Sequence, residues 1–597
     1  MTIKATPHKA RLTTLRYCLK KSNAEITYED VPLLQGIFFY YRKIKCSGME
    51  TDVNRITLVL TAAAVLAATF TSCGKKDKGE GTGHLYNAAL PANPQSLDPQ
   101  FADDSASATV IKNLYSGLLS ADSDGNITCQ NALSYEVSPD GLTYSFALRE
   151  DNYWFYDKND DDIVDDDEYF PVTADDYVFA LRRVLDPKMQ SPYARDFSCI
   201  KNGEDIIAGK SGTENAGVTA VGDYKLEITL DYPSAEFIGL LATQAAFPCN
   251  EEFFDSTKGR YGLDDKSVMS NGAFFVRQWF YDEYGTHNIL YMKKNAANEN
   301  DTNEICPSLL SFSIEKSENA VRGCFKEGKA DCISTMSAAY SSKKYAVTSS
   351  RATTLGLIFN PKDSCFGNEN LRKALAYSLD RDTLSGELSG DVTAAYGLIP
   401  PAVTLGGRSY RELSSDKQFG CYDLAAANGC FEKALKELNV GSVDGMKIMV
   451  CADTVNSDYL HTLSQRWQDS LGIYLGIEDV TASEYERRLA AGEYSVALYP
   501  LSADYNSGMS VAEQFETEKC LESAFDGIPH SDDIRRCATV QELVTAYTSA
   551  EKSLLGTYGF IPLFYKNTYL VANDGNEDIA MDAFSGAVDY KLAKNYN

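Results

Sequence analysis

The chain has 597 residues, which is enough for more than one domain of ordinary size. Hydrophobic residues make up 44% and charged residues 23%, as in folded globular proteins, and the net charge is −28. This negative charge argues against nucleic acid or an anionic membrane surface as the main partner. The five histidines argue against a catalytic or metal site built on several imidazoles.

The N-terminal region has the pattern of an export signal with a lipid attachment site. Residues 1–72 are basic overall and contain an uncharged, mostly apolar run at 56–70, which is short for a membrane span but suits a signal-peptide core. The run ends in FTSC at 70–73, which resembles the bacterial lipobox. We therefore expect Cys73 to carry a diacylglycerol. A buried cysteine on an apolar helix is disfavoured, because a polar, glycine-rich tether follows up to residue 83.

The start site stays open between Met1 and Met49, since neither gives an ideal basic flank before the apolar run. No other long apolar run follows Cys73, so we expect the body to be held at the extracytoplasmic face of the membrane by its lipid. Twelve of the 15 cysteines follow Cys73. They form no CxxC pair, which argues against a zinc ribbon or a thioredoxin, and their disulfide state stays open.

Helical and strand patterns alternate along the body. TYSFALR at 143–149 alternates as a strand after the turn sequence SPDG. Thr173 with Asp176 predicts a helix N-cap, and YKLEITL at 224–230 predicts a second strand. An apolar stripe predicts one helix over 371–384. Residues 447–451, 458–471 and 473–477 predict a strand, a helix and a parallel strand. The body is therefore expected to be a large α/β protein.

Catalytic motifs are mostly absent from the sequence. It contains no GxxxxGK[ST], HExxH or GxSxG pattern. An SxxK pattern does occur at Ser341–Lys344, as in penicillin-recognising enzymes, but it has no KTG partner and lies in a serine-rich stretch. A solvated loop is the better interpretation, and the chain is not expected to be an enzyme.

Several short segments follow one another in a fixed order over roughly residues 86–590. They are NPQSLDP (93–99) with LYSGLL (114–119), SPDGLTYSFALREDNYW (138–154) with PVTADD (171–176), DP (186–187) with SPYA (191–194), SNGAF (270–274), FN (359–360) with LRKAL (371–375) and DR (380–381), YG (396–397) with IPP (399–401), and SADYN (502–506) with IPL (561–563). Together they resemble the family 5 solute-binding proteins of ABC transporters, and in particular the oligopeptide-binding members.

The resemblance implies an α/β clamshell of the periplasmic-binding-protein type II class, with two lobes, a hinge and an extra smaller domain. Two strand crossings would form the hinge. After the N-terminal extension and signal peptide (1–72) and the tether (73–83), the implied parts are a first lobe (84–115, 249–353 and 567–597), an extra domain (116–248) and a second lobe (354–566).

The resemblance also implies a ligand site. In oligopeptide-binding members an Asp in an A-D-Y-N motif pairs with the peptide α-ammonium, and the matching residue is Asp504. An Asp in a turn is the alternative at this position. Other candidate positions are Tyr193, Asp103 and Ser105, Phe274, which stands where members often have Tyr, and the motif neighbours Leu501, Ser502 and Ala503. An ordinary surface or core role is the alternative for Tyr193, Asp103, Ser105 and Phe274. Leu501 stands where members often have Trp, and no basic residue clearly matches those that meet a peptide carboxylate.

An acidic segment at 157–168 follows the spacing of an EF-hand loop. Its side-chain ligands would be Asp157, Asn159, Asp161, Asp165 and Glu168, whose oxygens suit Ca²⁺. Asp162 stands where glycine normally permits the turn, so a solvated acidic loop is the alternative. A structural Ca²⁺ ion is the only cofactor that the sequence suggests.

The expected function is the capture of short peptides by a monomeric lipoprotein of the cell envelope and their delivery to ABC permease subunits. The same fold with an oligosaccharide, a metal chelate or haem as solute is an alternative. A sensor of peptide signals is another, and an anchored hydrolase is disfavoured by the absence of nucleophile motifs.

Overall fold

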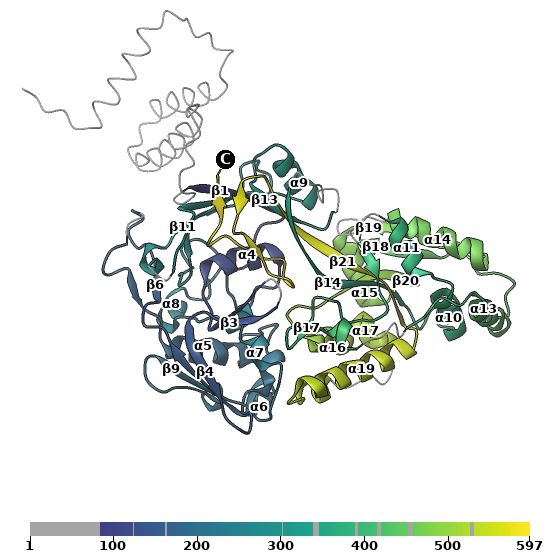
Figure 1. Ribbon diagram of the computed structural model, residues 1–597, viewed down its shortest axis with the longest axis horizontal. Helices are drawn as coiled ribbons and strands as arrows, with labels where there is room; N and C mark the ends of the chain where they lie inside the picture. Colours follow the sequence, from purple (N-terminus) through teal and green to yellow (C-terminus); the bar gives the residue numbers. More distant parts are fainter. Residues whose placement is uncertain are drawn as a thin grey trace, which may run out of the picture. The chain divides into compact units, whose positions relative to one another are not determined.

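The computed structural model describes residues 84–122, 125–161, 164–300, 303–337, 345–388, 392–414, 419–451, 458–525 and 531–596. Residues 79–597 form one compact unit, and the description below concerns that unit (Figure 1). The predicted signal peptide, Cys73 and Ser341–Lys344 lie outside the described residues. No helix among the described residues is both long and apolar enough to cross a membrane.

The first lobe is built on a four-stranded sheet in the order β1-β12-β11-β10. Its strands are β1 (Leu85–Leu90), β12 (Leu309–Ile314), β11 (Ile289–Lys294) and β10 (Phe274–Phe280). β1 and β12 are parallel, whereas the other neighbours are antiparallel. Helix α4 (Ser105–Leu114) packs near β10, and α9 (Glu318–Lys326) packs near β1.

Two long strands carry the chain between the lobes. β14 (Ala346–Phe359) and β21 (Phe560–Ala572) pair antiparallel along their length (Figure 1). At one end β21 pairs with β13 (Cys332–Thr335), and at the other β14 pairs with β20 (Val496–Ser502). The lobe boundaries implied by the sequence fall on paired positions here, because Thr353 lies opposite Lys566 and Thr354 opposite Tyr565. The pairing is irregular just before Thr353.

The second lobe contains the predicted strand-helix-strand unit. β18 (Lys447–Cys451) and β19 (Gly476–Val480) are parallel and joined through α14 (Asp458–Leu471). The second strand begins later than predicted, because Ile473 and Leu475 fill the core from the connection rather than from the strand. β20 pairs parallel with β18, and α13 (Leu424–Leu438), α15 (Ala482–Ala491) and α19 (Val540–Gly556) complete the larger elements.

The single helix predicted over 371–384 is wrong, because the segment forms two helices. α10 (Glu369–Tyr377) ends at Ser378, and α11 (Arg381–Glu387) begins after Asp380. The Asp380 carboxylate accepts a hydrogen bond of 3.1 Å from the Thr383 amide and so caps the second helix. The apolar stripe that suggested one helix is shared between the two, because Leu371, Leu375 and Leu384 are all buried.

The extra domain is built on an antiparallel sheet in the order β4-β5-β9-β8. Its strands are β4 (Ala132–Val137), β5 (Thr143–Leu148), β9 (Lys225–Thr229) and β8 (Val218–Ala220), which confirms the two strands predicted there. Helix α5 (Ala174–Leu185) begins with the predicted capping box of Thr173 and Asp176. In the chain, the short helix α6 (Gly203–Ile207) lies between β5 and β8, and α7 (Phe237–Leu240) follows β9.

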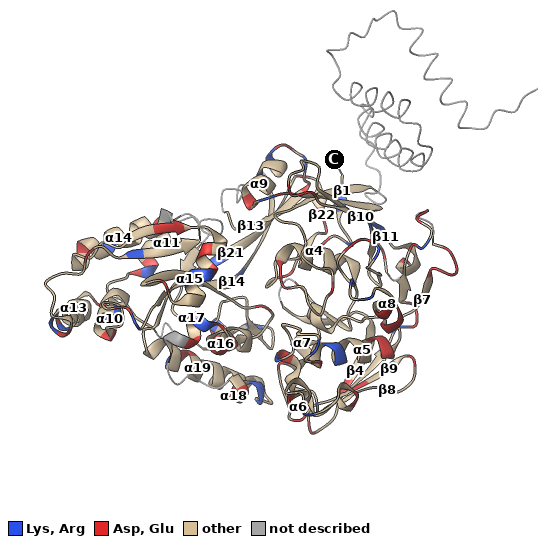
Figure 2. Ribbon diagram, turned by 180° about the vertical axis from the view of Figure 1, so that it is seen from behind, with Lys and Arg blue, Asp and Glu red and all other residues tan. Residues whose placement is uncertain are grey.

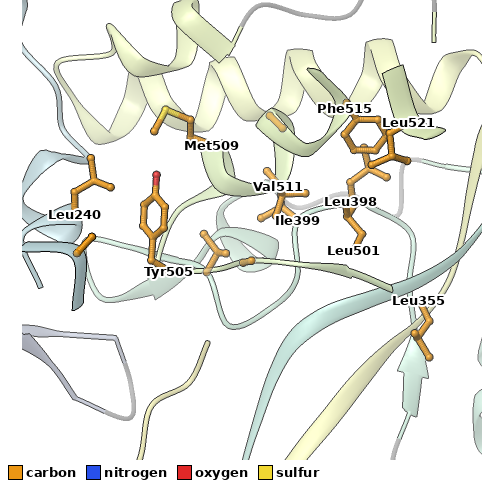
Figure 3. Packing of buried hydrophobic residues seen from close by; sticks show 14 of the residues in the cluster. Leu240, Leu355, Leu398, Ile399, Leu501, Tyr505, Met509, Val511, Phe515 and Leu521 are labelled. Carbon is orange, nitrogen blue, oxygen red and sulfur yellow. The ribbon is translucent and has the colours of Figure 1, made fainter. Parts of the chain in front are cut away.

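A buried apolar layer supports helix α16 (Gly508–Thr517), which follows β20 (Figure 3). It includes Leu398, Ile399, Leu501, Met509 and Phe515, each with 3% or less of its surface exposed. Gly508 permits this packing, since a Cβ there would lie 2.7 Å from Ile399 Cδ1 and 2.8 Å from the Tyr547 ring. The start of α16 is therefore held against the core of the second lobe.

Candidate functional site

The segment Ala503–Asn506 joins the end of β20 to the N-terminus of α16. The Ala503 amide donates a hydrogen bond of 2.9 Å to the Ala352 carbonyl, which extends the pairing of the sheet by one residue. Ser507 is the N-cap, and its Oγ accepts a bond of 2.9 Å from the Met509 amide. Asp504 is thus fixed between a strand of the crossing sheet and a capped helix.

The Asp504 side chain lies just beyond the end of β20 and is exposed. Desolvation by the surrounding protein nevertheless raises the pKa of the carboxyl to about 7. The negative charges of Asp196 and Glu518 raise this pKa further. Among the described residues, no cation forms an ion pair with Asp504 and no donor binds its carboxylate, although its own amide donates to Ser510 Oγ at 3.3 Å. A carboxylate that is accessible, desolvated and unpaired is suited to a cationic group of a ligand.

Tyr193 and Asp103 lie near Asp504, because the charges of both carboxylates act on the Tyr193 hydroxyl. The Tyr193 hydroxyl donates a hydrogen bond to the Ala102 carbonyl and accepts one of 3.1 Å from Gln244 Nε2. Burial raises the pKa of the Tyr193 hydroxyl, and the charges of Asp103, Asp504 and Asp196 raise it as well. The structure therefore brings together three residues that the sequence nominated from separate segments, the first and last of which are about 400 residues apart.

The other nominated residues differ in what they offer to a ligand. Ser105 is exposed at the first turn of α4. Ser502 is half-buried, and its hydroxyl lies 2.9 Å from Thr353 Oγ1. Leu501 and Ala503 are buried, with 0% and 1% of their surface exposed, and Phe274 is completely buried in the core of the first lobe. These last three side chains support the fold at the site and present no surface of their own.

Ion pairs and hydrogen bonds join the second lobe to the extra domain. Arg195 of the extra domain pairs with Glu516, and Arg535 of the second lobe pairs with Glu513 and donates a bond of 2.7 Å to Ser198 Oγ. The Ala235 amide donates to the Cys537 carbonyl at 2.9 Å. Figure 2 shows charged residues on α6 of the extra domain and on α16 and α18 (Ser531–Arg535) of the second lobe.

The sequence did not single out Asp196, Glu236, Glu513 or Arg535. Asp196 comes two residues after the SPYA segment, which is the only local signal for any of them. Their roles depend on the contact between two domains, and no pattern along the chain reports that contact. Burial and ion pairing in the folded molecule are what identify them.

The acidic loop at 157–168 is partly closed by Glu168. The Glu168 carboxylate is buried and accepts a hydrogen bond of 2.8 Å from the Lys158 amide, while Asn159 Nδ2 donates to Asp165 Oδ2 at 3.1 Å. Asp160 is paired with Lys266, and with Arg277 at 3.4 Å. Over the part of the chain that the structure describes, no three His, Cys, Asp or Glu side chains come together as metal ligands.

Residues 126–520 match the family model described as "Bacterial extracellular solute-binding proteins, family 5 Middle". Among curated relatives, the chain is 27% identical to the oligopeptide-binding protein OppA of Bacillus subtilis over 472 residues, which cover 77% of this chain and 82% of that protein. It is 25% identical to a dipeptide-binding protein of Lactococcus lactis, over 87% of this chain and 93% of that one.

Among solved structures, the chain resembles OppA of Listeria monocytogenes bound to peptide. The TM-score is 0.67 at 24% identity, over 86% of this chain and 99% of that one. This likeness, together with the crossing strands β14 and β21, confirms the predicted two-lobed type II fold with an extra domain.

Proposed function

The chain belongs to the bacterial extracellular solute-binding proteins of family 5, and from this we propose that it captures short peptides outside the membrane and delivers them to an ABC permease. Curated relatives named for oligopeptide and dipeptide binding support the peptide as solute. Capture and release need no covalent step, so we propose no catalytic role.

The observation that carries this proposal is the state of Asp504. Every peptide with a free N-terminus has an α-ammonium, which needs a charged acceptor when it leaves water. Asp504 offers an accessible carboxylate with no cation bound to it among the described residues. Tyr193 and Asp103 lie beside it and share its electrostatic environment. We propose that Asp504 binds the α-ammonium and that the first residue of the peptide lies beside Tyr193 and Asp103.

The test is a double cycle of calorimetric affinities. Peptides with a free or an acetylated N-terminus are titrated into the wild type and into Asp504→Asn. Loss of the carboxylate leaves a desolvated ammonium unpaired, which costs about 3–5 kcal/mol, or more than about a hundredfold in affinity. Acetylation is expected to do similar damage in the wild type and little further damage in the variant.

Asp469→Asn is the matched control, since Asp469 is an exposed carboxylate on α14 of the same lobe. It is expected to bind peptide as the wild type does. Additive losses from acetylation and from Asp504→Asn would mean that Asp504 does not contact the amine. Mass spectrometry of ligand that co-purifies with the protein tests the solute class, because an oligosaccharide, a metal chelate or haem in place of peptides would overturn the proposal. A peptide sensor would bind peptides but lack a partner permease.

We also propose that the protein acts as a monomer anchored by lipid at Cys73. The sequence before Cys73 supports the anchor, since an apolar run and small residues precede the cysteine. For the loop at 157–168 we propose Ca²⁺ as a structural ligand. That proposal rests on the chemistry of its donors, because all five candidate side chains supply oxygen.

A further inference from the structure

Beside Asp504 lies a second group of hydrogen-bond acceptors, and it belongs to Asp196, Glu236 and Tyr505. Glu236 and Tyr505 are buried, with 6% and 7% of their surface exposed. Glu236 Oε2 accepts a bond of 2.6 Å from Ser507 Oγ, but Glu236 Oε1 has no partner; the Tyr505 hydroxyl lies close to Ser507 but forms no hydrogen bond of regular geometry. Buried polar atoms are rarely left without a partner, so both atoms point to a missing group.

The three side chains share one electrostatic environment. Burial raises the pKa of the Glu236 carboxyl to about 8, and the charge of Asp196 contributes to this rise. Burial and the charges of Asp196 and Glu236 raise the pKa of the Tyr505 hydroxyl. Asp196 also raises the pKa of Asp504. The group therefore adjoins the carboxylate that is proposed to bind the peptide amine. Figure 3 shows the Tyr505 hydroxyl directed away from the backbone, between Leu240 and Met509.

The cations nearest to this group are already paired with other acids. Arg195 binds Glu516 and Ser531 Oγ, and its Nε lies 3.8 Å from Glu513. Arg535 binds Glu513 and Ser198. Both guanidinium groups lower the pKa of Asp196 against the effect of its burial, but neither forms an ion pair or a hydrogen bond with Asp196 or Glu236 among the described residues. The acidic groups Asp196, Glu236, Asp504, Glu513 and Glu516 therefore outnumber the basic groups here. This remains so when the α-ammonium of a peptide is added to Arg195 and Arg535.

We propose that Asp196, Glu236 and Tyr505 bind the positively charged side chain of the ligand's first residue, so that the protein prefers peptides with Lys or Arg at the N-terminus. This inference rests on the proposed peptide function. A lysine ammonium has three donors and no acceptor. The group offers it three acceptors, namely the Asp196 carboxylate, Glu236 Oε1 and the Tyr505 oxygen. The first residue is specified because its side chain starts next to the α-ammonium at Asp504.

The experiment compares four peptides by calorimetry on the full-length protein: Lys-Ala-Ala-Ala, norleucine-Ala-Ala-Ala, Ala-Ala-Lys-Ala and Ala-Ala-norleucine-Ala. Norleucine keeps the aliphatic part of lysine without its charge. A charge-assisted contact predicts that N-terminal Lys binds at least about tenfold more tightly than N-terminal norleucine. No such gain is expected when Lys is the third residue. An equal gain there would reflect general attraction to an acidic protein and would overturn the proposal.

Variants locate the effect. Asp196→Asn is expected to reduce the preference for N-terminal Lys to about twofold or less while N-acetylation still abolishes tight binding. Asp504→Asn is expected to weaken both N-terminal peptides equally. Tyr505→Phe removes only a hydroxyl. It provides a second measurement of the preference for N-terminal Lys if Asp196→Asn does not fold. If the uncharged peptide binds through its amine but N-terminal Lys gives no gain, this inference alone fails. If no peptide binds at all, the proposed function fails with it.

Discussion

The Ser507 hydroxyl donates a hydrogen bond of 2.6 Å to Oε2 of Glu236, and this bond joins the second lobe to the extra domain. The same hydroxyl accepts a bond from the Met509 amide as the N-cap of α16. One side chain therefore holds the helix that follows Asp504 and fixes it to a residue 271 positions earlier in the chain. The position of Asp504 depends on both contacts.

Ser507→Ala is expected to lower the free energy of unfolding by about 2–3 kcal/mol, because it removes a helix cap and leaves a buried carboxyl oxygen without a donor. Thr481→Ala is the matched control. Thr481 caps α15, and its side chain forms no hydrogen bond with the described residues of the extra domain, so its loss is expected to cost only about 1 kcal/mol. Urea unfolding of both variants measures the difference. Equal losses would show that the bond to Glu236 adds nothing to stability.

Local patterns predicted the elements whose signals lie close together in the sequence. The capping box of Thr173 and Asp176 is one example, since its two residues are three positions apart. The parallel unit of β18, α14 and β19 is another. The prediction of one helix over 371–384 was wrong because the helical spacing of apolar residues continues across the break between the two helices. Asp380 caps the second helix at that break. A hydrophobic period reports burial, but it does not report where a helix ends.

Some residues of the candidate site could likewise be predicted from the sequence, and others could not. Asp504, Tyr193 and Asp103 could be nominated from family motifs, and the structure places both carboxylates near the Tyr193 hydroxyl. Asp196 and Glu236 could not, because their importance arises from the closure of one domain on another. A buried carboxyl with an unpartnered oxygen is visible only after folding. Phe274 differs from these residues. It lies within a matching segment, but its side chain is buried in the core.

Lipid attachment is expected to depend on Cys73. Cells that express the wild type and are labelled with radioactive palmitate should yield a labelled protein, whereas Cys73→Ala should not be labelled, because the thiol is the attachment point. Cys129→Ala is the control, since Cys129 is an exposed cysteine of the body. Equal labelling of the wild type and Cys73→Ala would exclude this anchor.

Calcium binding is expected to depend on the ligand positions of the loop at 157–168. Calorimetric titration with Ca²⁺ should give a saturable heat in the wild type and none in Glu168→Gln, since Glu168 would supply the closing bidentate carboxylate. Asp166→Asn is the control, because Asp166 is exposed in the same loop but does not stand at a ligand position. If Asp166→Asn abolishes the heat as fully as Glu168→Gln does, the loop attracts cations only by its charge.

Peptide affinity is expected to vary with pH through the titration of Asp504. Its carboxyl has a pKa of about 7 because of desolvation and nearby negative charges, whereas pairing with an ammonium favours the ionised form and lowers that pKa. Binding therefore releases a proton below about pH 7. Affinity should fall about tenfold for each pH unit well below this value and should level off above it. A second decline is expected above about pH 8, where the peptide amine loses its proton.

Calorimetry with an uncharged-side-chain peptide between about pH 5.5 and 9 measures this profile, and buffers of different ionisation enthalpy count the protons released. Asp196 and Glu236 also have raised pKa values, so the variant Asp504→Asn is needed to separate the contributions. Because asparagine does not titrate, the variant should lose the part of the acid decline that belongs to Asp504 and keep the decline on the alkaline side. An acid decline of the same size in both proteins would assign the titration to Asp196 or Glu236, and it would remove Asp504 as the partner of the peptide amine.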